Sequence, residues 1–128
     1  MRRCLTSVVC TLFAIVWAGA AAGQSYPSRP IRLVIPFPAG GNVDTFARVL
    51  FRHVEEELGQ PIVIDNRGGA NGVVGADTVA KAAPDGYTIM ATSFGLAVNQ
   101  YLVKRLPFDL RKDFVPVTNI AYGDGYLM

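Results

Sequence analysis

The sequence contains little cysteine and little histidine, and both shortages exclude classes of protein. Its two cysteines, Cys4 and Cys10, stand among the first ten of 128 residues. If that segment is a leader, the remaining chain cannot be a disulfide scaffold and must be stabilised by apolar packing. His53 is the only histidine, and it stands inside a predicted helix without a second histidine or a cysteine to share a metal. We therefore expect no metal site and no cofactor.

The chain also lacks a strong excess of either charge. It has 12 basic and 10 acidic residues, and no more than two basic residues are adjacent. Proteins that bind nucleic acids usually carry a basic face, so we expect no nucleic-acid partner. The sequence shows no phosphate-loop lysine, and nothing in it indicates a Ser–His or Cys–His pair. It therefore assigns no catalytic residue.

Residues 1–25 have the pattern of a secretory signal. Arg2 and Arg3 precede the apolar run Val8–Ala22, and small residues follow it. Cleavage could follow any of several small residues, and we favour the region just before Tyr26. A single membrane anchor is the alternative, but the run is short for a span of about 20 residues and no charged stop-transfer segment follows it. We expect a periplasmic protein whose mature chain, without the two leader arginines, has ten basic and ten acidic residues.

The stretch Ile31–Arg48 is the centre of the predicted fold. The apolar residues Ile31, Leu33, Val34 and Ile35 form a short run that is typical of a strand buried on both faces of a parallel sheet. Two prolines end the strand, and Gly40-Gly41 predicts a tight turn before a helix from about Val43 to Leu58. This order places the free N–H groups of a helix N-terminus at the carboxyl end of a strand, an arrangement suited to an anion. An ordinary connection without a ligand is the alternative. The predicted apolar face of the helix comprises Phe46, Ala47, Leu50, Val54 and Leu58.

The same order of strand, glycine turn and helix recurs along the chain. Strands are predicted at 61–65 and 87–92, and turns at 66–72 and 93–95. Helices are predicted from about Gly72 and over 96–104, and further strands over 113–121 and 126–128. Small residues in the helix after Gly72 predict close packing on the sheet. The result is an α/β fold, a mainly parallel sheet with flanking helices, whose turns meet at one edge.

Several ordered motifs together resemble a known family. They are PFPAGGNVDTFAR (36–48), LGQPIVIDNRGGANGVVGAD (58–77), AAPDGY (82–87) and LPFDLRKDFVPV (106–117), behind the lead-in YPSRPIRLV. In this order they closely resemble the substrate-binding proteins of tripartite tricarboxylate transporters, also called Bug receptors. One departure is Gly68, which stands where the family usually has a proline and should loosen the second turn.

The resemblance implies a fold and a function. It implies a periplasmic-binding-protein type II-like architecture, with residues 26–128 as a partial first lobe that ends at the start of the second. It also implies a receptor, not an enzyme, that binds a small carboxylate and delivers it to the membrane subunits of a transporter. We expect a truncated product or a fragment, with weak or absent binding in isolation. A small α/β enzyme with an anion site at its helix N-termini, or a non-functional remnant, is the alternative.

The resemblance also implies a set of ligand-binding residues, which act largely through backbone amides and water. One alternative for Asp44 is that it only complements the dipole at the start of its helix; a carboxylate facing the solute would repel an anionic ligand. Phe37 and Phe94 could each wall a pocket or fill core, and we favour the pocket edge for Phe37. Arg67 could reach an anion or form a solvated ion pair. The implied first wall is Phe37, Ala39, Gly40, Gly41, Asn42 and Asp44, the second is Gly69, Ala70, Asn71 and Gly72, and the third is Ser93.

Overall fold

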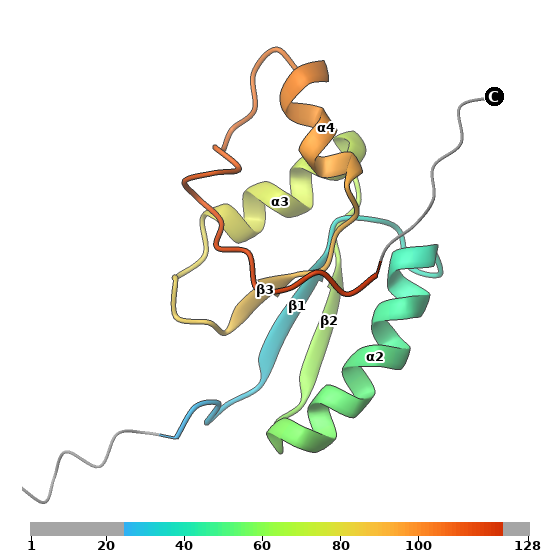
Figure 1. Cartoon of the computed structure of the whole chain (residues 1–128), viewed down its shortest axis with the longest axis vertical. Helices are drawn as coiled ribbons and strands as arrows, with labels where there is room; N and C mark the ends of the chain where they lie inside the picture. Colours follow the sequence, from blue (N-terminus) through green and yellow to red (C-terminus); the bar gives the residue numbers. More distant parts are fainter. Residues whose placement is uncertain (1–24, 122–128) are drawn as a thin grey trace, which may run out of the picture.

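A computed structural model describes residues 25–121 of the chain and shows a three-stranded parallel sheet between helices (Figure 1). The strands are β1 (Ile31–Ile35), β2 (Ile62–Asn66) and β3 (Thr88–Met90), in the order β2-β1-β3. The helices are α2 (Asn42–Leu58), α3 (Val73–Ala80) and α4 (Gly95–Leu102), and a short 3₁₀ turn η1 (Ala70–Gly72) precedes α3. The predicted α/β class and parallel sheet are confirmed. The predicted leader and the strand at 126–128 lie outside the described residues.

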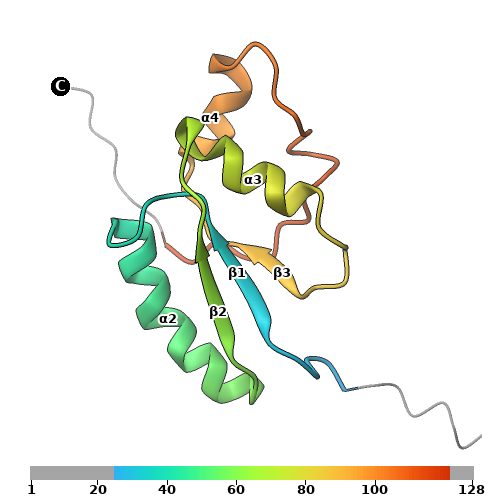
Figure 2. The same cartoon turned by 180° about the vertical axis from the view of Figure 1, so that it is seen from behind.

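The central strand β1 is covered on both faces, as its four apolar residues predict. Ile31 pairs with Ile62 of β2, and Leu33 pairs with both Ile64 and Ile89. Alternate side chains of a strand point to opposite faces, and β1 is buried on both: Ile31, Leu33 and Ile35 join the core beneath α2, while Val34 is also fully buried. Figures 1 and 2 show α2 on one side of the sheet and α3 and α4 on the other.

The helix α2 begins and ends where the sequence predicts, but it packs through a different face. Gly59 ends it in the left-handed conformation, with φ 62° and ψ 19°, and donates its N–H to the Glu55 carbonyl. The predicted members Phe46 and Leu58 are exposed, Phe46 to 46%. The residues that contact the core are Val43, Ala47, Phe51 and Val54. The observed face is rotated toward Val43 because Asp44, at the adjacent position, is also buried.

The opposite face of the sheet carries a second apolar cluster. Ala76 of α3, Leu96 of α4 and Phe108 are its buried members, and Met90 of β3 packs against them. Gly75 lies where α3 approaches Pro36 and the start of the second turn most closely. The predicted close packing of the small residues of this helix is therefore confirmed for Gly75 and Ala76, both of which are buried. No helix within residues 25–121 is long and apolar enough to cross a membrane.

The predicted strand at 113–121 is wrong. The structure assigns no strand to this segment, and Val115 and Val117 are 87% and 85% exposed. A strand requires a neighbour that accepts and donates its backbone hydrogen bonds, and none pairs with this segment among the described residues. The strand β3 is also shorter than the predicted 87–92, because only Arg32, Leu33 and Val34 of β1 pair with it.

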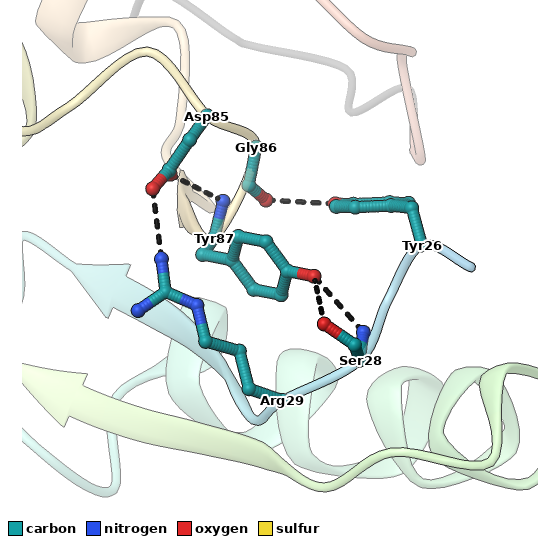
Figure 3. Close-up of polar contacts among 6 residues, drawn as sticks. All are labelled: Tyr26, Ser28, Arg29, Asp85, Gly86 and Tyr87. Atoms are coloured by element: carbon teal, nitrogen blue, oxygen red, sulfur yellow. Dashed lines mark hydrogen bonds and ion pairs between the residues drawn. The ribbon is translucent and has the colours of Figure 1, made fainter. Parts of the chain in front are cut away.

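The lead-in before β1 is attached to the turn that precedes β3 (Figure 3). Because β1 and β3 are parallel, this is the edge of the sheet opposite the glycine turns. The Tyr26 hydroxyl donates to the Gly86 carbonyl at 2.8 Å, and Arg29 pairs with Asp85 at 2.8 Å. The guanidinium of Arg29 also lies 4.2 Å from the centre of the Tyr87 ring. These contacts hold the start of the described chain against the amino end of β3.

We expect Tyr87→Phe to lower Tm by about 5 °C. The Tyr87 hydroxyl accepts the Ser28 N–H at 2.9 Å and lies 3.2 Å from the Ser28 hydroxyl. These contacts with Ser28 lower the pKa of the Tyr87 phenol. Thermal unfolding of the full chain followed by circular dichroism measures the effect. Tyr101→Phe is the matched control, because that ring is exposed on α4; equal shifts in the two variants would contradict a stabilising role for the contact.

Candidate ligand-binding site

The three glycine-bearing or polar turns lie at one edge of the sheet. Because β1, β2 and β3 are parallel, their carboxyl ends at Ile35, Asn66 and Met90 face the same way. The chain leaves β1 for α2 on one face of the sheet, whereas the helices after β2 and β3 lie on the other (Figures 1 and 2). The crevice beyond the carboxyl ends, at such a switch between β1 and β3, is where open α/β sheets bind ligands.

The first turn leads directly into the N-terminus of α2. Gly40 has φ 80°, and the Gly41 N–H donates to the Pro38 carbonyl at 3.3 Å. Gly41 is the N-cap residue, and no side chain caps the helix there. The first N–H groups of a helix have no intrahelical acceptor, so those at the start of α2 can donate hydrogen bonds to an anion. Ala39, Gly40 and Asn42 are exposed around this point, and Gly41 is half-buried.

Asp44 is buried and fully engaged by neighbouring donors. One of its carboxylate oxygens accepts the Gly40 N–H at 2.8 Å and the Arg48 Nε at 2.9 Å. The other accepts the Asn66 Nδ2 at 3.0 Å. The Arg48 guanidinium above all, with the Gly40 N–H and the Asn66 amide, holds the pKa of Asp44 well below its usual range. The carboxylate is therefore ionised, and its charge is compensated within the protein.

These hydrogen bonds define the structural role of Asp44. Its role is larger than complementing a helix dipole, because it connects the first turn, α2 and the end of β2. It also takes up the Gly40 N–H, so that this group is not free for a ligand. Phe37, predicted at the edge of a pocket, is half-buried and packs against the core cluster beneath α2. Its carbonyl accepts the second Asn66 N–H contact at 3.3 Å.

The second turn contains an unusual run of backbone conformations. All four residues from Gly69 to Gly72 have positive φ, including Ala70 at 45° and Asn71 at 53°. Gly69, Ala70 and Asn71 are exposed, whereas Gly72 is buried beside Pro36 of the first turn. A Cβ at Gly68 would meet the Pro38 ring at 3.4 Å. The first and second turns are therefore in contact, as their shared edge requires.

The third turn connects β3 to α4. Ser93 is exposed, and its carbonyl accepts the Leu96 N–H at 3.2 Å at the start of the helix. Phe94 is 82% exposed and therefore belongs to no core. Asn99, one helical turn further along α4, exchanges two hydrogen bonds with Asn71 of the second turn. The third turn is thus connected to the second through α4.

Arg67 forms an ion pair and does not extend as a free cation. Its Nε donates to Asp65 at 2.9 Å, and Arg32 donates to the same carboxylate oxygen. The guanidinium of Arg32 first, and Arg67 second, lower the pKa of Asp65. Of the two alternatives for Arg67, an anion contact or a solvated ion pair, the structure shows the ion pair.

Three residues that support the site were missed by sequence reasoning: Arg48, Asn66 and Asn99. Arg48 is half-exposed and donates to both Asp44 and Asn66. Its spacing of four residues from Asp44 on a helix was a signal that could have found it. The two asparagines act across 22 and 28 residues of sequence, and nothing local in the sequence indicates such contacts.

The parallel sheet presents the N-terminus of α2, without a side-chain cap, and two further turns at one edge, an arrangement of an α/β protein that suits an anion. The comparison with protein families agrees. The family described as "Tripartite tricarboxylate transporter family receptor" matches residues 46–127. This chain belongs to that family, which confirms the resemblance drawn from the motifs.

Three solved structures share the fold of the described part. One, described as "Structure of a periplasmic transporter", is 49% identical with a TM-score of 0.70, over 74% of this chain and 32% of that one. MatC of Rhodopseudomonas palustris with bound malate is 41% identical with a TM-score of 0.69, over 72% and 32%. R. palustris Rpa4515 with adipate is 38% identical with a TM-score of 0.63, over 66% and 29%. The chain likewise spans about a third of the curated relatives it matches, 29% of one and 34% of another.

Proposed function

We propose that this chain provides one wall of a periplasmic receptor that binds a small carboxylate solute for a tripartite transporter. The family description and the two solved relatives with malate and adipate support this proposal. The two solutes differ in length, and both end in carboxylates. What they share is therefore the group that backbone N–H donors recognise through charge-assisted hydrogen bonds.

One observation carries the proposal: the donor groups meet at one edge of the sheet, while the negative charge of Asp44 beside them is compensated within the protein. Asp44 would repel a carboxylate if its charge faced the solute. Its carboxylate is instead buried among Arg48, Gly40 and Asn66. The solute would then meet the Asn42 N–H at the start of α2, the N–H groups of Gly69, Ala70 and Asn71, and Ser93. The N–H groups of Gly41 and Gly72 already donate to the Pro38 and Gly69 carbonyls. Gly40 and Asp44 would act by holding the first turn in shape.

The remaining parts of the proposal follow from the receptor function. Residues 1–25 act as a leader that is removed on export, and residues 26–128 form part of the first lobe. The partners are the solute and the membrane subunits of the transporter. Because water-bridged contacts tolerate solutes of different length, the wall described here selects for a carboxylate end and not for one particular acid.

We expect the exported full chain to bind malate and adipate weakly, with Kd of about a millimolar. The ¹⁵N-labelled protein is recovered from the periplasm of a Gram-negative host, and its intact mass is expected to correspond to a start near Tyr26. Addition of either dicarboxylate is expected to shift the amide signals of Gly41, Asn42 and Gly69–Gly72. Signals of the lead-in around Ser28, at the opposite edge, should stay unchanged.

Two amide-to-carboxylate replacements provide a matched test. Asn42→Asp adds one negative charge at the start of α2 and should weaken binding about three- to tenfold. Gln60→Glu adds the same charge beyond the other end of α2 and should leave binding unchanged. Equal effects of the two variants, or shifts confined to residues away from the turns, would contradict a carboxylate site at this edge.

A further inference from the structure

Asn99 is the buried polar side chain that connects two walls of the proposed site. It lies on α4 at 1% exposure, among the apolar residues that cover one face of the sheet. A buried amide is unfavourable unless its donor and acceptor are both paired. Both groups of Asn99 are paired with one residue, Asn71: its Nδ2 donates to the Asn71 carbonyl at 2.8 Å, and its Oδ1 accepts the Asn71 Nδ2 at 2.6 Å.

The residue that Asn99 holds has a backbone conformation that side chains disfavour. Asn71 has φ 53° and ψ 39°, and Ala70 before it has φ 45°. Left-handed conformations are costly for most residues with a Cβ; asparagine tolerates them better than alanine does, but two such residues in succession are uncommon. No side chain caps the short η1 turn. Within the turn the Gly72 N–H donates to the Gly69 carbonyl at 2.9 Å, and the paired hydrogen bonds from α4 add a contact from outside that favours this shape.

We propose that Asn99 is a positioning residue of the solute site, whose buried amide keeps Asn71 left-handed and thereby fixes the direction of the N–H groups of the second turn. This inference rests on the proposed function for its consequence in binding. The same pair connects the second turn to α4, which begins directly after Ser93 and Phe94. The second and third walls are therefore held as one unit.

The test compares Asn99→Ala with Gln100→Ala in the exported full chain. A strong NOE between the amide and α protons of one residue marks positive φ, because the two protons are then close together. Asn99→Ala is expected to lose this NOE at residues 70 and 71 and to weaken malate binding about tenfold. Gln100 is exposed on the same helix, and its variant should keep both properties.

A second replacement separates positioning from general stability. Glycine adopts the left-handed conformation without support, so adding Asn71→Gly to Asn99→Ala should restore positive φ at residue 71. It should also return the malate Kd to within about threefold of the parent chain. A merely structural role for Asn99 predicts that the double variant melts as low as Asn99→Ala and binds as weakly.

The outcomes distinguish the two proposals. If the parent chain binds neither malate nor adipate, the proposed function fails, while the NOE comparison without ligand still decides the role of Asn99. If Asn99→Ala keeps the strong NOE at Ala70 and Asn71, the positioning role is wrong. Should Asn99→Ala not fold, Asn99→Asp takes its place, because one of its oxygens would face the Asn71 carbonyl and break the same pair.

Discussion

Replacing Gly75 with alanine is expected to lower the free energy of unfolding by about 2–3 kcal/mol. A Cβ at this position would lie 2.7 Å from the Pro36 Cβ and 2.8 Å from both the Pro36 Cα and the Arg67 carbonyl oxygen. These atoms belong to the backbone and to a proline ring, so they cannot move aside as a flexible side chain can. Alanine is the better helix former by about 1 kcal/mol, so the loss would run against helix propensity.

Gly95→Ala is the matched control for this change. It also lies on a helix, and the nearest atom to its Cβ would be the Ser93 Oγ at 3.5 Å, an ordinary contact. We expect its stability to be unchanged or slightly higher. Urea unfolding of both variants and the parent chain measures the difference. If Gly75→Ala were as stable as Gly95→Ala, the close approach of α3 to the first turn would be wrong.

The consequences of Gly75→Ala should extend to the site. Gly75 contacts Pro36 of the first turn and the Arg67 carbonyl at the start of the second. A helix displaced by the added methyl group would therefore also move Gly72, which packs against Pro36. This position shows how a requirement for close packing can be predicted from a run of small residues, as it was for Gly75 and Ala76, whereas the identity of the contacting atoms cannot.

Most of the fold could be predicted because its signals are local. Four apolar residues followed by a proline predicted β1, and the Gly40-Gly41 turn predicted the start of α2. The errors arose where contacts between distant segments, and not the local sequence, determine the structure. Phe46 and Val43 both fit an apolar helical stripe, and the burial of Asp44 determines that Val43 faces the core. The segment 113–121 has the composition of a strand, but no described strand pairs with it.

The position of the candidate site could be predicted from the sequence, but the contacts that hold its turns in shape could not. Parallel strands and glycine turns were enough to bring residues 37–44, 69–72 and 93 to one edge. The residues that hold the turns in shape, Asn66 and Asn99, make contacts across long stretches of sequence. Their partners are buried side chains or backbone groups of other elements, and such pairs become visible only when the elements are packed.

Asp44→Asn is expected to lower Tm by about 10 °C, because three donors are directed at a carboxylate that an amide cannot replace. The amide has one oxygen and would turn its N–H₂ group toward at least one of the Gly40, Arg48 and Asn66 donors. Asp77→Asn is the matched control. Asp77 also pairs with a cation four residues later, Lys81, but its other oxygen has no partner among the described residues. Its replacement should change Tm by no more than about 2 °C.

The pH dependence of stability provides the more specific test of Asp44. Folding lowers the pKa of this carboxylate from its ordinary value of 3.8, with Arg48 as the main cause. The unfolded chain therefore binds a proton more readily, and the stabilisation is complete above the ordinary value and is lost as the pH falls below it. The difference in Tm between the parent chain and Asp44→Asn should be constant from about pH 8 to pH 5 and should shrink below about pH 4.

Some acid sensitivity should remain in the variant, because folding also lowers the pKa values of Asp65 and Asp109. A difference that stayed constant down to about pH 2 would show that Asp44 stabilises the turn through its shape and not through its charge.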